Sequence, residues 1–275
     1  MKKELSELFA FVKDTDRLLV ITGAGCSTDS GIGDYRDDNG SWKKPPPVQY
    51  QDFLRSETVR KRYWLRSQLG YPSFRDALPN QAHLSLARLE GSGIIQGLIT
   101  QNVDRLHQEA GQKKVIDLHG RLDQAVCLGC NKITPRNQIQ DWLETENSFV
   151  NELAFELRPD GDASAEHYDL DSFLVPKCRD CDGIVKPNVV FFGGSVPKQT
   201  VENCLDWVKR SDSVLIVGTS LMAYSAFRLV RLASERGLPI ASLNRGTTRA
   251  NRLVTTNIVE NCSEMLSALE AILKG

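Results

Sequence analysis

Short, almost continuously apolar runs recur along the chain and predict buried β-strands. They cover residues 17–22, 93–100, 114–118, 188–192, 213–217 and 238–243. Most of these runs do not alternate with polar residues, as expected where helices cover both faces of a parallel sheet. Helical periodicity lies between them, for example over 201–209 and 225–236, and the first turns after Met1 are amphipathic. This order predicts a doubly wound parallel α/β sheet.

Two stretches interrupt this pattern and predict a smaller lobe. Residues 35–80 contain a polar, proline-rich loop followed by helices rich in arginine and aromatic residues, and residues 121–186 contain two pairs of cysteines. A ligand is expected in the crevice at the carboxyl ends of the strands. We therefore expect a Rossmann-like domain made of residues 1–34, 81–120 and 187–275, a zinc-binding module at 121–186, and a loop with a helical insertion at 35–80.

Composition narrows the choice of protein class. The 275 residues are 41% apolar and 25% charged, and no apolar run is long enough to cross a membrane. A formal net charge of −1 argues against a nucleic-acid binder that neutralises many phosphates. The first residues lack the apolar core of an export signal, so a cytoplasmic location is expected. The sequence does not indicate an oligomeric state.

The cysteines favour a metal site over a disulfide framework. Seven is an odd number, and four of the seven fall into two Cys-x-x-Cys pairs. Four thiolates fill the tetrahedral shell of Zn²⁺ and leave no position for water, so the metal would be structural. A redox dithiol is the competing interpretation, although it would need only one pair. The predicted zinc ligands are Cys127, Cys130, Cys178 and Cys181.

A glycine-containing turn follows the first predicted strand. Gly23, Ala24 and Gly25 would let the backbone approach a pyrophosphate, and the helix start behind them offers N–H groups to anionic oxygens. A tight strand-to-helix turn without any ligand is an equal alternative. The third glycine of the dinucleotide fingerprint is missing, and so is the acid expected about 20 residues further on. A hydride-transferring dehydrogenase is therefore disfavoured.

Five blocks in the correct order resemble the signature of the sirtuin family of NAD-dependent protein-lysine deacylases. The first block, residues 23–36, reads GAGCSTDSGIGDYR. The others are TQNVDRLH at 100–107, LHG at 118–120, KPNVVFFG at 186–193 and VGTS at 217–220. Any one block would be only suggestive, whereas the five together span most of the chain.

The resemblance implies that the acyl oxygen of an acyl-lysine attacks C1′ of the nicotinamide ribose of NAD. Nicotinamide leaves, and an alkylimidate collapses to lysine and O-acyl-ADP-ribose. His119 is then the base for the ribose hydroxyls and Asn102 orders the ribose and a water, whereas His83 and His107 are interpreted as structural. By itself a histidine after a strand is more often structural as well. The NAD-binding residues implied by the resemblance are Gly23, Ala24, Gly25, Thr28, Asp34, Tyr35, Arg36, Gln101, Asn102, Asp104, His119, Gly218, Thr219, Ser220, Asn244 and Cys262.

Four of these positions keep a second interpretation or fill a gap. Asp104 can accept hydrogen bonds from the nicotinamide amide, or it can cap the helical segment that follows. Tyr35 and Arg36 lie on a loop that either closes over the cofactor or is solvated. Asn244 resembles the family residue that binds the adenosine ribose, and it would replace the missing acid.

The segment that follows the second cysteine pair resembles the family strand that pairs with the substrate peptide through main-chain hydrogen bonds. Gly194 stands where family members usually carry an acid, which puts the peptide preference in doubt. Gly33 replaces the usual proline and should loosen the cofactor loop. The implied substrate-binding residues are Val190, Phe191, Phe192 and Gly193.

Tyr63 and Arg66 are three residues apart in a predicted helix and project from one face. Their spacing resembles the pair that reads acyl carboxylates in sirtuin desuccinylases, and an arginine fork suits a carboxylate. The sequence thus predicts acceptance of acidic or longer acyl groups, with a solvated surface helix as the alternative. Residues 60–66, together with 79–83 and 158–162, resemble the class II branch, which includes mitochondrial sirtuin four.

Three other functions remain open at this point. Mono-ADP-ribosyl transfer would use the same NAD site with another nucleophile, and the sequence does not separate the two. A hydride-transferring enzyme and an NAD-sensing scaffold without catalysis are the others. The expected partners are acyl-lysine proteins, with neither nucleic acid nor a membrane.

Overall fold

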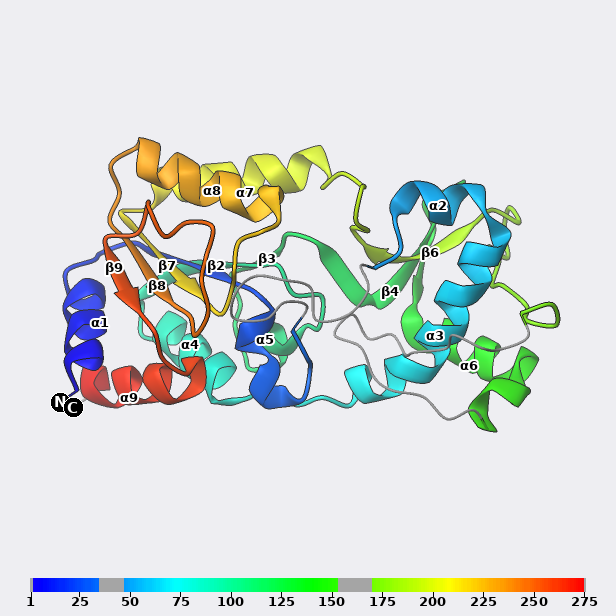
Figure 1. The fold of residues 1–275 in the computed structure, drawn as a ribbon, viewed down its shortest axis with the longest axis horizontal. Coiled ribbons are helices and arrows are strands. Elements are labelled where there is room, and N and C mark those ends of the chain that lie inside the picture. Colours follow the sequence, from blue (N-terminus) through cyan, green and yellow to red (C-terminus); the bar gives the residue numbers. More distant parts are fainter. Residues whose placement is uncertain (1, 35–46, 153–169, 275) are drawn as a thin grey trace.

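The computed structural model describes residues 2–34, 47–152 and 170–274, which form a larger and a smaller lobe (Figure 1). The larger lobe comprises α1 Lys3–Lys13, β1 Leu18–Thr22, η1 Ala24–Cys26, η2 Thr28–Ser30, α4 Gln81–Gly91, β2 Ile95–Thr100, α5 Leu106–Glu109, β3 Val115–Asp117, α7 Lys198–Arg210, β7 Ser213–Val217, α8 Tyr224–Glu235, β8 Ile240–Leu243, β9 Thr256–Ile258 and α9 Cys262–Lys274. The smaller lobe comprises α2 Tyr50–Arg55, α3 Glu57–Arg75, β4 Gly120–Cys127, β5 Ile133–Pro135, α6 Arg136–Glu146, η3 Ser148–Glu152 and β6 Val185–Val189.

The larger lobe contains a six-stranded sheet in the order β3-β2-β1-β7-β8-β9. Every neighbouring pair in it is parallel. The chain fills the sheet outward from β1 in one direction and then, from β7, in the other, so the strand order reverses between these two strands. The predicted doubly wound sheet is confirmed, and its switch point lies at the carboxyl ends of β1 and β7, where such folds bind ligands.

Two hydrophobic cores lie on opposite faces of this sheet. In β1, Leu18 and Val20 pack into a core shared with α1, α4 and α9, whereas Leu19 and Ile21 pack into a core shared with α7 and α8. All four side chains are 0–1% exposed. Figure 1 shows the two groups of helices on either side of the sheet. Burial on both faces explains why the strand sequences are apolar throughout.

The smaller lobe contains an antiparallel sheet in the order β5-β4-β6. The strand predicted over 188–192 as part of the parallel sheet is wrong. Its first residues belong to β6, which pairs with β4, and the next ones leave the sheet toward the crevice. Apolarity misled the prediction because Phe191 is buried in the core of the smaller lobe and Val189 packs against that core.

Aromatic rings dominate that core. Tyr63 packs against Trp64, Phe53 and Phe191, with ring centroids 5.0–5.5 Å apart. Cys127 and Cys178 belong to the same cluster, so the metal-binding turns and the helices α2 and α3 share one core. Among the described residues, no helix combines the length and apolarity needed to span a membrane.

Candidate functional site

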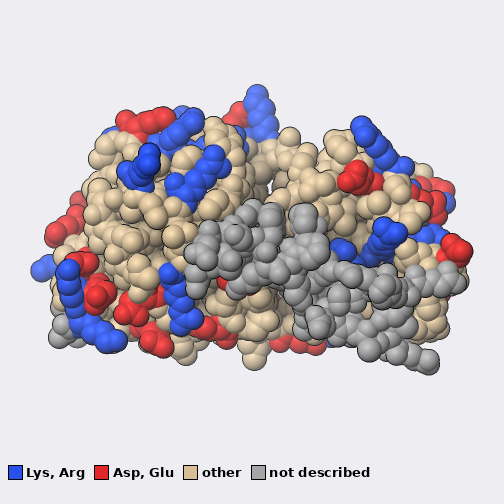
Figure 2. Space-filling view, in the orientation of Figure 1, with Lys and Arg blue, Asp and Glu red and all other residues tan. Residues whose placement is uncertain are grey.

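A cavity of about 1120 Å³ lies between the two lobes, over the carboxyl ends of the parallel strands. Figure 2 shows the surface notched between the lobes, with charges of both signs interspersed on each side. Tyr35 and Arg36 lie outside the described residues, and Arg66 does not line the cavity. The other predicted ligand-binding residues all do: Gly23, Ala24, Gly25, Thr28, Asp34, Tyr63, Gln101, Asn102, Asp104, His119, Val190, Phe191, Phe192, Gly193, Gly218, Thr219, Ser220, Asn244 and Cys262.

The glycine turn is shaped by contact with the end of β7. The N–H of Gly25 donates to the carbonyl of Gly218 at 2.8 Å. A Cβ atom on Gly23 would lie 2.5 Å from Cβ of Thr219, and one on Gly25 would lie 2.9 Å from the carbonyl oxygen of Gly218. These glycines are therefore required by the close approach of two backbone segments, before any ligand is considered. The alternative of a tight turn and the ligand-binding interpretation both fit this geometry.

Replacing Gly218 by alanine tests this packing. Gly218 has a φ of +59°, and a Cβ there would overlap the backbone nitrogen of Cys26. Gly237 is the matched control, since its φ is +73° and a Cβ atom there would have no neighbour within 4 Å. Both variants carry a left-handed alanine, which costs about 1–2 kcal/mol. We expect only Gly218→Ala to weaken NAD binding, on the order of tenfold or about 1.4 kcal/mol by titration calorimetry; equal affinities of the two variants would contradict this.

His119 lies just beyond β3 and both of its ring nitrogens are bonded. Nδ1 is 3.1 Å from the carbonyl oxygen of Gln101, and Nε2 is 2.8 Å from the hydroxyl oxygen of Ser225. A carbonyl only accepts, so Nδ1 carries the proton and Nε2 presents the lone pair. Burial lowers the pKa of His119, which the bond to Gln101 partly opposes. The ring is thus a neutral base at pH 7 with its basic atom defined.

Asn102 and Asp104 meet at one hydroxyl group. Nδ2 of Asn102 donates to the hydroxyl oxygen of Ser27 at 2.9 Å, and that hydroxyl donates to Oδ2 of Asp104 at 2.7 Å. Nδ2 of Asn102 also donates to the carbonyl of Gly23 at 3.1 Å. The amide and the carboxylate are therefore held on the same wall of the cavity by the glycine turn.

Asp104 also serves the helix that follows it. Its Oδ1 accepts from the N–H of Leu106, the first residue of α5, at 3.0 Å, although the N-cap position itself is Arg105, and its side chain still lines the cavity. Burial raises its pKa, and the bonds from Leu106 and Ser27 oppose that effect. The two interpretations of Asp104 are therefore compatible.

The two histidines interpreted as structural lie behind this wall. His83 is 0% and His107 1% exposed, with ring centroids 4.7 Å apart. Nε2 of His83 is 3.3 Å from the hydroxyl of Ser27, and Nε2 of His107 is 2.9 Å from that of Thr22. Burial lowers the pKa of His83 to about 4 and that of His107 well below its ordinary value, so both are neutral at pH 7.

The far end of the cavity is formed by the carboxyl ends of β7 and β8. Nε2 of Gln101 donates to the hydroxyl of Thr219 at 2.9 Å, which joins this end to the histidine side. Nδ2 of Asn244 donates to the carbonyl of Gly246 at 2.7 Å, in the turn after β8. Cys262 begins α9, and burial raises its thiol pKa to about 12, so it is a neutral wall residue.

The opposite end is formed by the segment that leaves β6. The N–H of Val190 donates to the carbonyl of His119, and the carbonyl of Phe192 accepts from the N–H of Tyr50, both at 2.8 Å. The ring of Tyr63 lies 5.0 Å from that of Phe191. This end is therefore apolar and is fixed both to the backbone of His119 and to the smaller lobe.

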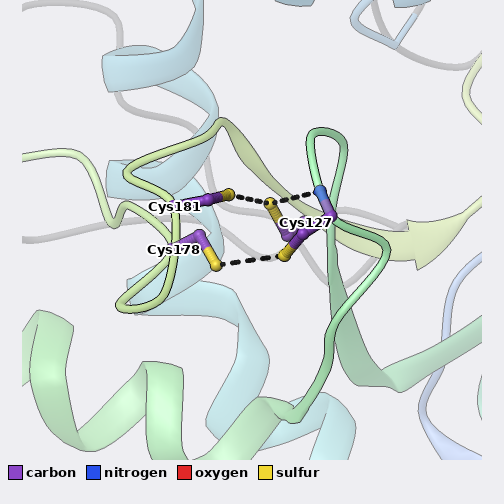
Figure 3. A group of neighbouring side chains, drawn as sticks. Cys127, Cys178 and Cys181 are labelled. Carbon is purple, nitrogen blue, oxygen red and sulfur yellow. Dashed lines mark hydrogen bonds between the residues drawn. The ribbon is translucent and has the colours of Figure 1, made fainter.

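The four predicted zinc ligands converge in the smaller lobe (Figure 3). Their sulfur atoms lie within 4.8 Å of one another, with Cys127 to Cys181 at 3.4 Å and Cys130 to Cys178 at 3.6 Å. A tetrahedral site with Zn–S bonds of about 2.3 Å needs sulfur separations of about 3.8 Å. Backbone N–H groups of Cys130 and then Gly129 lower the pKa of Cys127 to about 6. The cluster fits a structural zinc ion.

A parallel sheet with a ligand cavity at its switch point, joined to a tetrathiolate lobe, defines a nucleotide-dependent enzyme with a structural metal. The chain belongs to the Sir2 family, which it matches over residues 23–225.

Relatives and solved structures agree with this membership. The chain is 52% identical over 259 residues to "NAD-dependent protein deacetylase 2" of Bradyrhizobium diazoefficiens, covering 94% of this chain and 95% of that one. It is 47% identical over 264 residues to an NAD-dependent protein deacetylase of Bordetella bronchiseptica, covering 96% of each. A solved complex of Sir2 with a p53 peptide and NAD⁺ superposes with a TM-score of 0.78 at 27% identity, covering 100% of this chain and 99% of that one.

Two residues that contact the predicted site were not found from the sequence. Ser27 lies inside the first block, but its bonds to Asn102 and Asp104 join positions 75 and 77 residues apart. Ser225 bonds to His119 across 106 residues. A serine near the start of a helix is common, so no local pattern marks either contact.

Proposed function

We propose that this chain is an NAD-dependent protein-lysine deacetylase that releases nicotinamide and O-acetyl-ADP-ribose. The observation that carries the proposal is the meeting of a neutral histidine, His119, with Asn102 and Asp104 around one cavity at the switch point of the sheet. The names of the relatives, at 47–52% identity, support the same activity. Two similar solved structures are of Sir2 with a p53 peptide and NAD⁺, and with a deacetylated p53 peptide and 3′-O-acetyl-ADP-ribose.

In this proposal His119 acts as the base. Its Nε2 takes a proton from a ribose hydroxyl of the bound dinucleotide, and the hydroxyl oxygen keeps the electron pair for attack on the acyl-derived carbon. Because Nδ1–H is bonded to the carbonyl of Gln101, the ring keeps this orientation throughout. A pKa lowered by burial keeps Nε2 unprotonated at neutral pH.

Asn102 and Asp104 bind and orient the nicotinamide half. Nδ2 of Asn102 is fixed by its bonds to Gly23 and Ser27. The carbonyl oxygen of the same amide is therefore available to accept a hydrogen bond on the ribose side of the cavity. The carboxylate of Asp104, held by Ser27 and Leu106, has further lone pairs that can accept from the nicotinamide amide. Rigid placement of both groups favours the reacting geometry over other ribose orientations.

Protein substrates would enter from the apolar end, between the lobes. The segment Val190–Gly193 is proposed to pair with the peptide backbone, and the acyl-lysine side chain would pass along Phe191 toward His119. The NAD-binding part would then be residues 1–34, 81–120 and 187–275, with 121–186 as the zinc module and 35–80 as the cofactor loop and helical insertion.

The test is turnover of NAD that depends on an acetyl-lysine peptide. We expect nicotinamide, deacetylated peptide and O-acetyl-ADP-ribose in equal amounts by liquid chromatography and mass spectrometry. Formation of ADP-ribosylated protein instead of these products would favour mono-ADP-ribosyl transfer. NAD consumption that does not depend on the peptide would contradict deacetylation. An increase in reduced nicotinamide absorbance would revive a hydride-transferring enzyme.

We further propose that the site accepts acidic or longer acyl groups and that the chain belongs to the class II branch. Support for the first part is the position of Tyr63 in the cavity wall beside Phe191. Arg66 lies on the same helix but does not line the cavity. Recognition of an acyl carboxylate therefore requires the Arg66 side chain to reorient toward the cavity. The class II placement rests on the sequence of 60–66, 79–83 and 158–162, the last of which lies outside the described residues.

A panel of acetyl-, succinyl- and glutaryl-lysine peptides tests the acyl preference. We expect Arg66→Ala to lower kcat/KM for the acidic acyl groups about 10- to 150-fold, since loss of one charge-assisted contact costs about 1.5–3 kcal/mol, while acetyl turnover stays within twofold. Arg62→Ala, an exposed arginine one turn away on α3, is the matched control. Equal losses for acetyl and glutaryl peptides would contradict the preference.

We also propose a cytoplasmic location. A site built from four cysteine thiolates suits a reducing compartment, where thiols bind metal rather than form disulfides. Fractionation of cells that express the chain tests this location; recovery of the protein with exported fractions would contradict it.

A further inference from the structure

The second ring nitrogen of His119 is occupied by a side chain rather than by backbone. Oγ of Ser225 lies 2.8 Å from Nε2, opposite the 3.1 Å contact of Nδ1 with the carbonyl of Gln101. Because that carbonyl fixes the proton on Nδ1, the hydroxyl of Ser225 must donate to Nε2 in the neutral ring. The ring is thus held at both nitrogens, by the end of β2 and by the first turn of α8.

Ser225 has a fixed position in the fold. It is the second residue of α8, whose preceding loop runs from Gly218 at the end of β7. Ala226, the next residue, is 0% exposed in the core beneath the sheet, which anchors this turn. The side chain of Ser225 lines the same cavity as His119. A rotation of the imidazole away from the cavity would therefore break a bond at each end of the ring.

We propose that Ser225 is a positioning residue for His119. Its hydroxyl holds the lone pair of Nε2 at the cavity wall, and it turns to accept from Nε2–H once the imidazole has taken a proton. The same group then suits both protonation states, because a hydroxyl is a donor and an acceptor. The catalytic consequence rests on the proposed function, whereas the contact itself does not.

The chemical step is a simple proton transfer. A ribose hydroxyl takes the place of the Ser225 hydroxyl at the one lone pair of Nε2, gives its proton to that atom and keeps the electron pair. Once the ribose oxygen has formed its bond to the acyl-derived carbon, the imidazolium donates one N–H to the carbonyl of Gln101 and the other to Oγ of Ser225. Hydrogen bonds with an ionised partner are shorter and stronger than neutral ones. Oγ of Ser225 therefore stabilises the imidazolium of His119 that forms in the reaction. Alanine at position 225 offers no such acceptor.

The test compares Ser225→Ala with Ser225→Thr, which keeps the hydroxyl. Ser234→Ala is the control, because it makes the same change near the other end of α8. We expect Ser225→Ala to lower kcat on the order of tenfold while KM for NAD stays within twofold, and threonine to restore most of kcat. A kcat unchanged in Ser225→Ala, or lowered equally in Ser234→Ala, would overturn the proposal.

A spectroscopic measurement separates this inference from the proposed function. In protein labelled with ¹⁵N-histidine, loss of the donor should move the Nε2 resonance of His119 toward that of an imidazole without a hydrogen bond at this atom, and threonine should restore it. An Nε2 resonance that is the same in Ser225→Ala and wild type would overturn the contact. If the resonance moves but no acyl-peptide releases nicotinamide, the positioning contact stands and the proposed deacetylase function fails.

Discussion

Replacing His119 by alanine is expected to lower kcat for acetyl-lysine peptides by about 10²- to 10⁴-fold, the usual contribution of a positioned base. NAD should still bind, because the glycine turn, Asn102, Asp104 and the end of β7 are unchanged. The measurement is a steady-state rate with NAD and peptide, together with calorimetric binding of NAD to the variant. A loss of less than about fivefold would contradict the role of His119 as the base.

The pH dependence follows from the same histidine. Burial lowers the pKa of His119 below the ordinary value of about 6.5, so the base form persists to lower pH. The acid limb of kcat/KM should therefore lie below pH 6.5, and activity should fall as the pH drops through the lowered pKa, where Nε2 becomes protonated. The residual activity of His119→Ala should show no such acid limb. If the limb remains in this variant, the titration belongs to another group.

Replacing Cys178 by serine is expected to release the zinc ion and unfold the smaller lobe. Structural zinc supplies about 10–16 kcal/mol in zinc-finger peptides, which is as large as the whole net stability of a typical domain, about 5–15 kcal/mol. Cys127 and Cys178 are also part of the aromatic core that contains Phe53 and Trp64, so losing the ion loosens that core. Metal content is measured by elemental mass spectrometry and local unfolding by hydrogen exchange.

The pattern of exchange distinguishes local from global effects. Peptides from 120–150 should exchange quickly in Cys178→Ser, while those from β7 should stay protected. Cys204→Ala is the control, since Cys204 is buried in the larger lobe and lies outside the cluster; it should keep about one equivalent of zinc. Full zinc content with unchanged exchange in Cys178→Ser would contradict the metal assignment.

Most of the parallel sheet was predictable because its strands are buried on both faces. Apolar runs of five or six residues favour buried strands when glycine or helical periodicity follows them, as in β1 and β7. The run at 188–192 failed because burial by one lobe's aromatic core gives the same pattern as burial in a sheet. The local sequence indicates how deeply a segment is buried, but not which element it packs against.

The site was predictable in part for a similar reason. Residues that follow parallel strands gather at one edge of the sheet, so Asn102, His119 and Gly218 were expected to meet. Their hydrogen bonds were not predictable, since Ser27 and Ser225 reach them only through the three-dimensional packing of the turn after β1 and the start of α8. Arg66, in contrast, shares a helix with Tyr63 but does not line the cavity, because a shared helical face does not fix the length or direction of a long side chain.

Transfer of a labelled oxygen tests the central claim most directly. An acetyl-lysine peptide carrying ¹⁸O in its acetyl group is incubated with NAD and the protein, and the masses of the products are measured by mass spectrometry. If the acyl oxygen attacks the ribose in the cavity beside His119, the label appears in O-acetyl-ADP-ribose. Label recovered only in acetate, as in direct hydrolysis by water, would contradict the account.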